Sequence, residues 1–173
     1  MKTHRTMATV KVIHSITACN YDEFWSKSST EPGVGRIVSN VSRKKFKLDL
    51  QYNDLMQSKE ILNVEYKSSV GEPRKINAKA TLCSGANNSQ HKVTYFLKNR
   101  QPHYDPTLRK YVLNYNGRAK LSSKHNFQIV DESFPDEILM QLGKIESGYY
   151  NCDFSFPLCA FQAFGFALSS LCR

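Results

Sequence analysis

The chain has 173 residues, a length that fits one domain and leaves little room for a second. Hydrophobic residues make up 40% and charged residues 23% of the sequence, which supports one core and excludes a disordered chain. The 24 Lys and Arg outnumber the 15 Asp and Glu. The resulting charge of +9 points to a phosphate-bearing partner, either nucleic acid or anionic lipid.

The positive charge is concentrated in the middle of the chain. Residues 34–79 contain ten Lys and Arg against five acids, and residues 80–130 contain eight against one. Residues 131–173 instead carry two basic residues and six acids. The basic surface is therefore expected to come from the central segments and not from a C-terminal basic tail.

The cysteines indicate neither a metal site nor a redox site. The five residues Cys19, Cys83, Cys152, Cys159 and Cys172 are irregularly spaced and form no CxxC pair. The N-terminus, Met1–Arg5, lacks the apolar segment of a secretory signal. We therefore expect a protein of a reducing compartment, with free thiols and without a metal or cofactor.

Most of the chain has the pattern of short β-strands separated by turn-forming residues. Residues 45–52 alternate polar and apolar side chains without a break, which is the period of a half-buried strand. Asn116-Gly117, after the alternating run 111–115, predicts a hairpin turn. The expected strands are residues 9–16, 45–52, 61–67, 74–81, 92–98, 111–115, 127–130, 137–145 and 149–156. So many short strands predict a sandwich or a barrel.

The C-terminal segment has a different pattern. Residues 158–171 carry no charge and place Ala, Leu and Phe on every side of a helix, and Pro157 fits its first turn. Such a helix must be buried on all sides. Roughly 14 residues at ~1.5 Å each give ~21 Å, short of the ~30 Å hydrocarbon core of a bilayer. We therefore predict a mainly β fold, an antiparallel β-barrel, closed or partly closed, around a buried hydrophobic C-terminal α-helix.

The same segment resembles a known family. Phe156–Phe164 and Ala167–Ser170 are similar to the C-terminal signature of the tubby family. Residues 111–118, 126–130 and 140–144 resemble further segments of that family, in the same order and spacing. The match is close from about residue 109 to 171 and weaker from 34 to 75. Several motifs in one order make this a specific resemblance.

The resemblance implies a non-catalytic protein that binds phosphatidylinositol bisphosphate at the cytoplasmic face of the plasma membrane. It also implies release when that lipid is hydrolysed, a receptor or trafficking protein as partner, and a location that extends to the nucleus or cilium. Against the family domain, residues 9–173 are expected to lack the first strands of the barrel, and residues 1–8 to be disordered. The stretch between Lys75 and Lys98 is shorter than in the family, and the tail after the helix is short.

The family holds the lipid phosphates with a Lys-x-Arg pair and with an Arg on a later strand. By position, Arg36 corresponds to the first member of the pair, and Val38 stands where the second basic residue is expected. The later Arg falls near Ser58, next to Lys59. Phosphates need converging cations, with Arg as a fork and Lys as a point charge. The candidate phosphoinositide-binding residues are Arg36, Lys59, Lys45 and Arg74.

Other interpretations remain beside lipid binding. The scattered His and Cys residues suggest no catalytic dyad, so an enzyme is not expected. The net charge is compatible with nucleic-acid binding, although the sequence has no recognition-helix pattern, RNP-like motif or zinc finger. A protein-interaction scaffold that has lost lipid binding and uses its strand edges is a third interpretation. The candidate cations also fit plain solvated strand faces. The sequence leaves the oligomeric state open.

Overall fold

The computed structural model describes residues 6–11, 35–52, 57–82 and 93–172. Within these ranges it contains eleven strands and one helix. They are β1 (Thr6–Lys11), β2 (Gly35–Ser39), β3 (Lys45–Tyr52), β4 (Gln57–Lys67), β5 (Lys75–Thr81), β6 (Thr94–Asn99), β7 (His103–Asp105), β8 (Lys110–Val112), β9 (Phe127–Asp131), β10 (Ile138–Glu146), β11 (Tyr149–Phe154) and α1 (Ala160–Leu171). Nine strands form one antiparallel sheet in the order β1-β11-β10-β9-β6-β5-β4-β3-β2, and β7 pairs with β8 in a separate hairpin.

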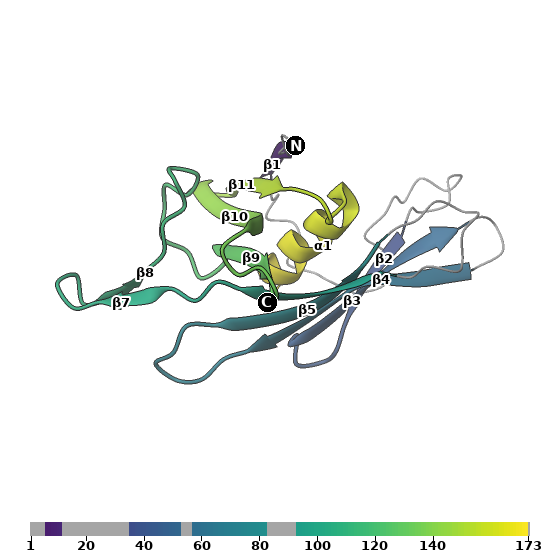
Figure 1. Ribbon diagram of the computed structural model, residues 1–173, viewed down its shortest axis with the longest axis horizontal. Coiled ribbons are helices and arrows are strands. Elements are labelled where there is room, and N and C mark those ends of the chain that lie inside the picture. The colour runs from purple at the N-terminus through teal and green to yellow at the C-terminus, as the bar shows by residue number, and fades with distance from the viewer. Residues whose placement is uncertain (1–5, 12–34, 53–56, 83–92, 173) are drawn as a thin grey trace.

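The large sheet curls around α1. Figure 1 shows β10 and β11 on one side of the helix and β3, β4 and β5 on the other. β1 and β2 stand at the two ends of the strand order, and among the described residues they do not pair with each other. The structure therefore confirms the predicted antiparallel barrel around a C-terminal helix, in its partly closed form.

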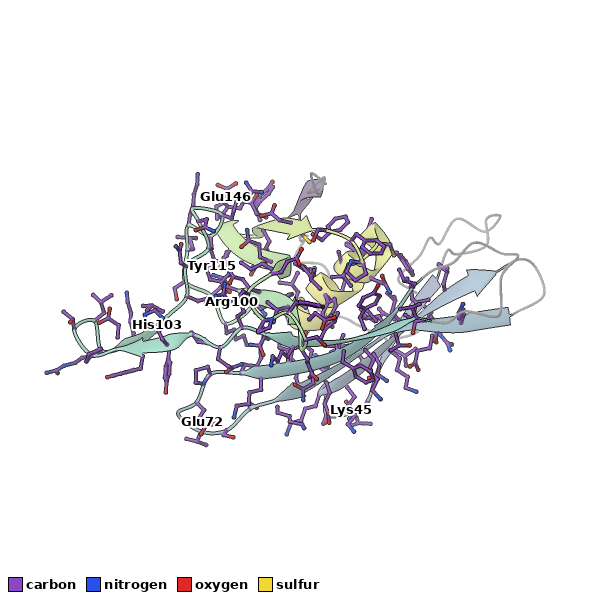
Figure 2. The ribbon with its side chains drawn as sticks, in the orientation of Figure 1. Lys45, Glu72, Arg100, His103, Tyr115 and Glu146 are labelled. Atoms are coloured by element: carbon purple, nitrogen blue, oxygen red, sulfur yellow. The ribbon has the colours of Figure 1, made fainter. Side chains whose placement is uncertain are left out.

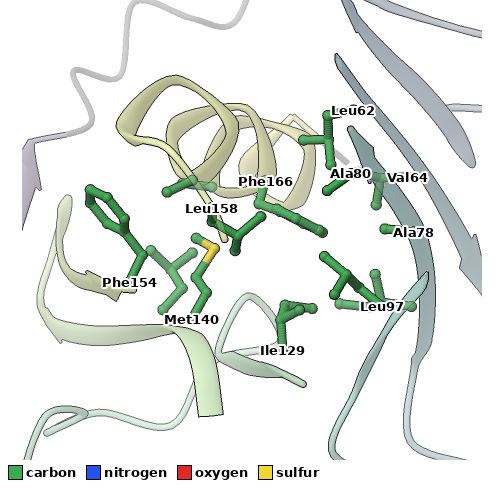
Figure 3. Packing of buried hydrophobic residues seen from close by; sticks show 14 of the residues in the cluster. Leu62, Val64, Ala78, Ala80, Leu97, Ile129, Met140, Phe154, Leu158 and Phe166 are labelled. Carbon is green, nitrogen blue, oxygen red and sulfur yellow. The ribbon is translucent and has the colours of Figure 1, made fainter. Parts of the chain in front are cut away.

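Hydrophobic side chains from both halves of the sheet meet the helix in one core. Leu62 and Leu97 reach it from β4 and β6, and Met140 reaches it from β10 (Figure 3). Phe166 of α1 lies between them and is fully buried, with its ring centroid 6.3 Å from that of Phe127. Because side chains alternate along a strand, the inward positions bury the helix while the outward positions remain available to polar residues.

Buried polar side chains fix the helix in place. The Gln162 amide nitrogen donates hydrogen bonds to the carbonyl oxygens of Ile61 (2.9 Å) and Thr81 (2.8 Å). Toward the other end of the helix, the hydroxyl oxygens of Tyr66 and Ser169 lie 2.7 Å apart. These bonds satisfy polar groups that burial would otherwise leave unpaired, so they define one position for the helix against the sheet.

The helix begins later than the sequence predicted. Pro157, expected in its first turn, lies before the helix, and Cys159 is the N-cap of Ala160–Leu171. The Cys159 N–H donates to the side-chain oxygen of Gln162 at 3.0 Å, and this bond satisfies a backbone group at the helix start. Within the described residues, no helix is long and apolar enough to cross a membrane.

The strands agree with the predicted pattern in most places. β3 spans residues 45–52 as expected. β1 begins at Thr6, so residues 6–8, which were expected to be disordered, belong to a strand, because they pair with β11. The short strands β2 and β7 were not expected, since three to five residues carry little alternation.

The predicted turn at Asn116-Gly117 forms, but the predicted hairpin around it is wrong. Both residues have positive φ, 50° and 75°, as such a turn requires. The strand before the turn ends at Val112, and β8 pairs with β7 instead of with a later strand. One cause is that the Gln128 side chain donates to the carbonyl oxygen of Asn114 at 2.8 Å, which holds this segment against β9.

Replacing Phe166 by Ala is expected to lower the free energy of unfolding by about 3–5 kcal/mol, because it leaves a cavity where both halves of the sheet meet the helix. Urea unfolding followed by circular dichroism measures this change. Phe134→Ala is the control, since its side chain is 67% exposed, and it should change the free energy by less than about 0.5 kcal/mol. Equal effects of the two substitutions would contradict the central position of the helix.

Candidate functional site

Cations line the side of the sheet that faces away from the helix. In β5 the exposed Lys75 and Lys79 alternate with buried residues, and in β3 Lys45 and Lys47 do the same. In Figure 2, Lys45 points away from the side on which the helix lies. The outer basic face is defined here as Arg36, Lys45, Lys47, Lys75 and Lys79, which occupy exposed positions of β2, β3 and β5. This face is a broad surface of spaced charges and not a pocket.

Arg36 is an exposed residue of the end strand β2. Its register partner is Asp49 of β3, which in turn pairs with Glu60 of β4. The carboxylates of Asp49 and Glu60, on the next two strands, weaken the local positive potential. Among the described residues, Arg36 makes no ion pair. The guanidinium therefore remains accessible to an external anion.

Lys59 lies on the opposite side of the sheet from Arg36. Its register partner is Leu50, which packs against the core, whereas the partner of Arg36 is Asp49, one residue earlier on β3. Directly opposed residues share a face and successive residues alternate, so the two cations point to different sides. The structure thus does not bring Arg36 and Lys59 together.

A β-bulge in β4 causes this separation. The pairing shifts between Leu48 and Asp49, so that Ile61 is an extra residue on β4. Ile61 and its neighbour Leu62 are both buried, which breaks the alternation of the strand. In a regular strand, Lys59 would lie three residues before the inward-facing Leu62 and would point outward. Because the bulge inserts one residue, Lys59 instead points to the inner side of the sheet.

Lys45 is ion-paired on the outer basic face. Its Nζ lies 3.4 Å from the carboxylate of Glu65, and the neighbouring Lys47 lies 3.2 Å from Glu60. Both lysine side chains stay mostly exposed, at 63% and 60%. Exposed pairs of this kind are worth only about 0–1 kcal/mol, so an anionic surface can compete for these lysines.

Arg74 lies apart from the other three candidates, at the C-terminal end of the helix. Its guanidinium donates to the Ser170 hydroxyl at 3.1 Å and lies 5.0 Å from the centre of the Tyr66 ring. Its carbonyl oxygen accepts a hydrogen bond from the Asn99 side chain at 2.9 Å. These contacts give Arg74 a structural role, because a cation near a helix C-terminus stabilises the last turn.

Arg74 also lines an open groove with a volume of about 780 Å³. The wall includes the segment before β5, the end of β6, strand β8, Leu113, Tyr115 and residues 119–127. We call it the basic groove, because its charged lining residues are the five cations Arg74, Arg100, Lys110, Lys120 and Lys124 and the single acid Glu72. Arg100 and Tyr115, two of its lining residues, are labelled close to each other in Figure 2.

The groove shifts the pKa values of its buried titratable groups. Burial lowers the pKa of His125, and the nearby charges of Lys124, Arg74 and Lys144 lower it further, while a hydrogen bond to Ser170 opposes the shift. That bond joins Nδ1 of His125 to the Ser170 carbonyl oxygen at 2.7 Å, so Nδ1 carries the proton. Burial raises the pKa of Tyr115 to about 12. Both groups are therefore neutral at pH 7, and the charge of the groove comes from Arg and Lys.

An ion pair between the partly exposed Arg118 and the buried Asp153 holds one wall of the groove. The Arg118 guanidinium donates two hydrogen bonds to the carboxylate of Asp153, at 2.9 and 2.8 Å, and Asp153 is 1% exposed. The same carboxylate accepts a bond from Gln141 at 2.8 Å. Arg118 precedes the groove residues Ala119 and Lys120, so this bidentate pair fixes their backbone against β10 and β11.

Thiols and metal ligands make no comparable cluster in the part of the chain that the structure describes. Cys152 lies buried in β11, and Cys159 and Cys172 are the N-cap and C-cap of α1, while Cys19 and Cys83 lie outside the described residues. Burial raises the pKa of Cys152 to about 12, so its thiol stays protonated and unreactive. The described ranges contain no group of three His, Cys, Asp or Glu side chains that would hold a metal ion.

The sequence analysis did not predict the basic groove. Of its five cations only Arg74 was a candidate, and it was proposed for a different site. The available signal was the excess of eight basic residues over one acid in residues 80–130. That excess indicated a positive region but not a concave one, because the groove walls are far apart in the sequence.

A comparison with models of protein families identifies the family of this chain. The model of the Tub family matches residues 55–172, more than half of the chain. The chain belongs to the Tub family. Its relatives include the protein king tubby 2 of Aedes aegypti, which is 47% identical over 74 residues, covering 43% of this chain and 18% of the relative.

Two vertebrate proteins are also similar to this chain. The human Tubby-related protein 3 is 45% identical over 74 residues, covering 43% of this chain and 17% of the relative. The mouse Tubby-related protein 3 is 36% identical over 109 residues, covering 63% of this chain and 23% of the relative. The chain thus spans about a fifth of the length of the curated relatives it matches.

Removing Arg118 is expected to destabilise the protein strongly. Arg118→Met leaves the Asp153 carboxylate buried without its cation, which should cost about 3 kcal/mol in urea unfolding. Adding Asp153→Asn to this variant removes the stranded charge and should restore part of the loss. A stability of Arg118→Met equal to that of the original protein would show that the ion pair does not hold this wall.

The stability of the protein is expected to fall as the pH drops from 7.5 to 5.5. Because the pKa of His125 is lowered in the folded state, the unfolded state takes up the proton first. The stability given by the neutral ring is complete above about pH 6.5, the ordinary value, and is lost as the pH falls through 6.5 toward the lower folded pKa. His125→Gln should therefore reduce the shift of the urea midpoint between the two pH values. An unchanged shift would exclude His125 as its source.

Proposed function

We propose that this protein is a non-catalytic module that binds phosphoinositide at the cytoplasmic face of the plasma membrane. The observation that carries the proposal is the outer basic face, with an accessible Arg36 among exposed lysines, on a chain of the Tub family. The proposed contacts are electrostatic, between these cations and the phosphates of the lipid headgroup.

A broad strand face suits a planar membrane. Each Lys or Arg near an anionic membrane surface contributes about 1 kcal/mol, so several spaced cations suffice for reversible attachment. The exposed pairs Lys45–Glu65 and Lys47–Glu60 lose little when a phosphate replaces a carboxylate. Arg36 adds a planar fork that two phosphate oxygens can accept, which a lysine does not.

Selectivity among anionic lipids rests on few residues in this proposal. Val38 stands next but one to Arg36 on β2, and Lys59 points to the other side of the sheet. The contacts proposed for specific recognition therefore reduce to Arg36 with support from Lys45, while the other cations supply general attraction. Arg74, which is engaged by Ser170 and Tyr66, is left out of the lipid contact. Binding of this kind is weakened by salt.

The partners and the location follow the same proposal. A receptor or trafficking protein is the proposed cargo, and the cytoplasm, the inner plasma membrane, the cilium and the nucleus are the proposed locations. Support comes from membership of the Tub family. The chain matches about a fifth of each relative, so the proposal concerns this domain and not the whole length of those proteins.

Arg36→Ala is expected to weaken binding to vesicles that contain phosphatidylinositol bisphosphate by about fivefold, the equivalent of ~1 kcal/mol per cation at the surface. Sedimentation with liposomes of phosphatidylcholine plus this lipid measures the change. The matched control is Arg109→Asn, which removes the same charge from the β7–β8 turn at the far end of the molecule (Figure 1) and tolerates the positive φ of 49° at that position. The control should stay within twofold of the original protein.

A comparison of vesicles with different anionic lipids tests whether the binding is specific for phosphoinositide. Stronger binding to the bisphosphate lipid than to phosphatidylserine at matched total charge supports it. Equal binding to both vesicles would contradict phosphoinositide recognition and leave only charge attraction. A salt-sensitive shift of duplex DNA, together with no lipid preference, would favour a nucleic-acid partner instead.

A further inference from the structure

The basic groove is a second surface, separate from the outer basic face. It lies around the C-terminal end of α1 and is formed by loops and by strand β8, whereas the outer basic face belongs to β2, β3 and β5. No residue of the outer basic face lines the groove. A ligand in the groove would therefore leave Arg36 and its neighbours accessible.

The groove has five cations and only one acidic residue in its lining, so its net charge is positive. Glu72, its single acidic lining residue, lies 3.6 Å from Lys75, which is outside the groove. In the described ranges, no carboxylate is within ion-pair distance of Arg100, Lys120 or Lys124. The lowered pKa of His125 has the same origin in part, since Lys124 and Arg74 contribute to it. An anionic ligand would relieve the repulsion among these groups.

The groove also offers an apolar surface and a strand edge. Tyr111, Val112, Leu113 and Leu121 line it together with the cations, and Tyr111 and Leu121 are 47% and 45% exposed. Strand β8 supplies the first two of these residues, and among the described strands it pairs only with β7. Its other edge therefore has backbone N–H and C=O groups available to an added strand.

These features favour an extended peptide over a compact phosphate group. A phosphate needs cations that converge on one point, usually with a free arginine fork. In the groove, the Arg74 guanidinium is already held by Ser170 and Tyr66, and the other cations belong to three different segments. Cations distributed along a groove that also has apolar side chains and an available strand edge match a strand that alternates acidic and apolar side chains.

We propose that the basic groove binds an acidic peptide segment of a partner protein, added as a strand to the edge of β8. The carboxylates of the segment face Arg100, Lys120 and Lys124, and its apolar side chains pack on Tyr111 and Leu121. The Arg118–Asp153 pair keeps the wall that carries Lys120 in position.

Fluorescence polarisation with the full chain tests this proposal. The probe is a labelled seven-residue peptide that alternates Glu with Val. One control peptide has Gln in place of every Glu, and a second has methyl groups on alternate backbone nitrogens to block strand pairing. The Glu peptide should bind at least tenfold more tightly than either control. Equal binding of all three peptides, or no binding of the Glu peptide, would overturn the proposal.

Two charge variants locate the binding. The double variant Lys120→Ser with Lys124→Ser should weaken binding of the Glu peptide at least fivefold. Its control, Lys45→Ser with Lys47→Ser, removes the same charge from the outer basic face and should change binding less than twofold. An equal loss in both variants would mean nonspecific attraction and would overturn the proposal. Urea unfolding of both variants checks that each remains folded.

The ring protons of His125 give an independent reading by NMR. Carboxylates in the groove should raise the pKa of His125 toward its ordinary value, whereas the Gln peptide should leave it unchanged. No shift with the Glu peptide would overturn the assignment to this groove.

The peptide test is separate from the test of lipid binding. Arg36→Ala should not alter the affinity for the peptide. The Lys120/Lys124 variant should keep its preference for phosphoinositide vesicles over charge-matched vesicles. Displacement of the Glu peptide by soluble inositol phosphate, with no effect of backbone methylation, would identify a phosphate site and overturn the peptide proposal.

Discussion

The burial of the uncharged helix α1 is the constraint on which the rest of the structure depends. Phe166 and its apolar neighbours leave water only if strands surround the helix on more than one side, so the sheet must curl. The hydrophobic effect does not specify one position of the helix. The hydrogen bonds from Gln162 to β4 and β5 do, because they fix how far the helix is inserted. A glycine at position 165 permits the approach: a Cβ there would lie 2.7 Å from Leu48.

The same helix organises the groove at its C-terminal end. Arg74 and His125 both bind Ser170, the first through the hydroxyl and the second through the carbonyl oxygen. The last carbonyl groups of a helix carry partial negative charge, which attracts such donors. Two groove segments that are distant in the sequence are thereby tied to one helix end. The shape of the groove consequently depends on the position of the helix, and any loosening of the core should also disturb the groove.

The two basic surfaces of the molecule differ in what they can recognise. The outer basic face is exposed and broad, and its lysines are balanced in part by Glu60 and Glu65, so it suits a surface of many weak contacts. The basic groove is concave, has one acid, and combines cations with aromatic and aliphatic side chains. A concave site with apolar lining favours a ligand of defined shape. The proposed membrane contact and the proposed peptide contact therefore lie on separate surfaces of one domain.

The sequence by itself determined the elements whose signal is local. The unbroken alternation of residues 45–52 specified β3, and the absence of charge in residues 158–171 specified a buried helix. The tertiary structure alone decided which cations meet. The bulge at Ile61 turns Lys59 away from Arg36, and no local pattern announces that single extra residue, because it is selected by pairing with β3. Lys120 and Arg74 share the groove only because contacts to Ser170 and Asp153 fold distant segments together, and such contacts follow from the packed core instead of from neighbouring residues in the chain.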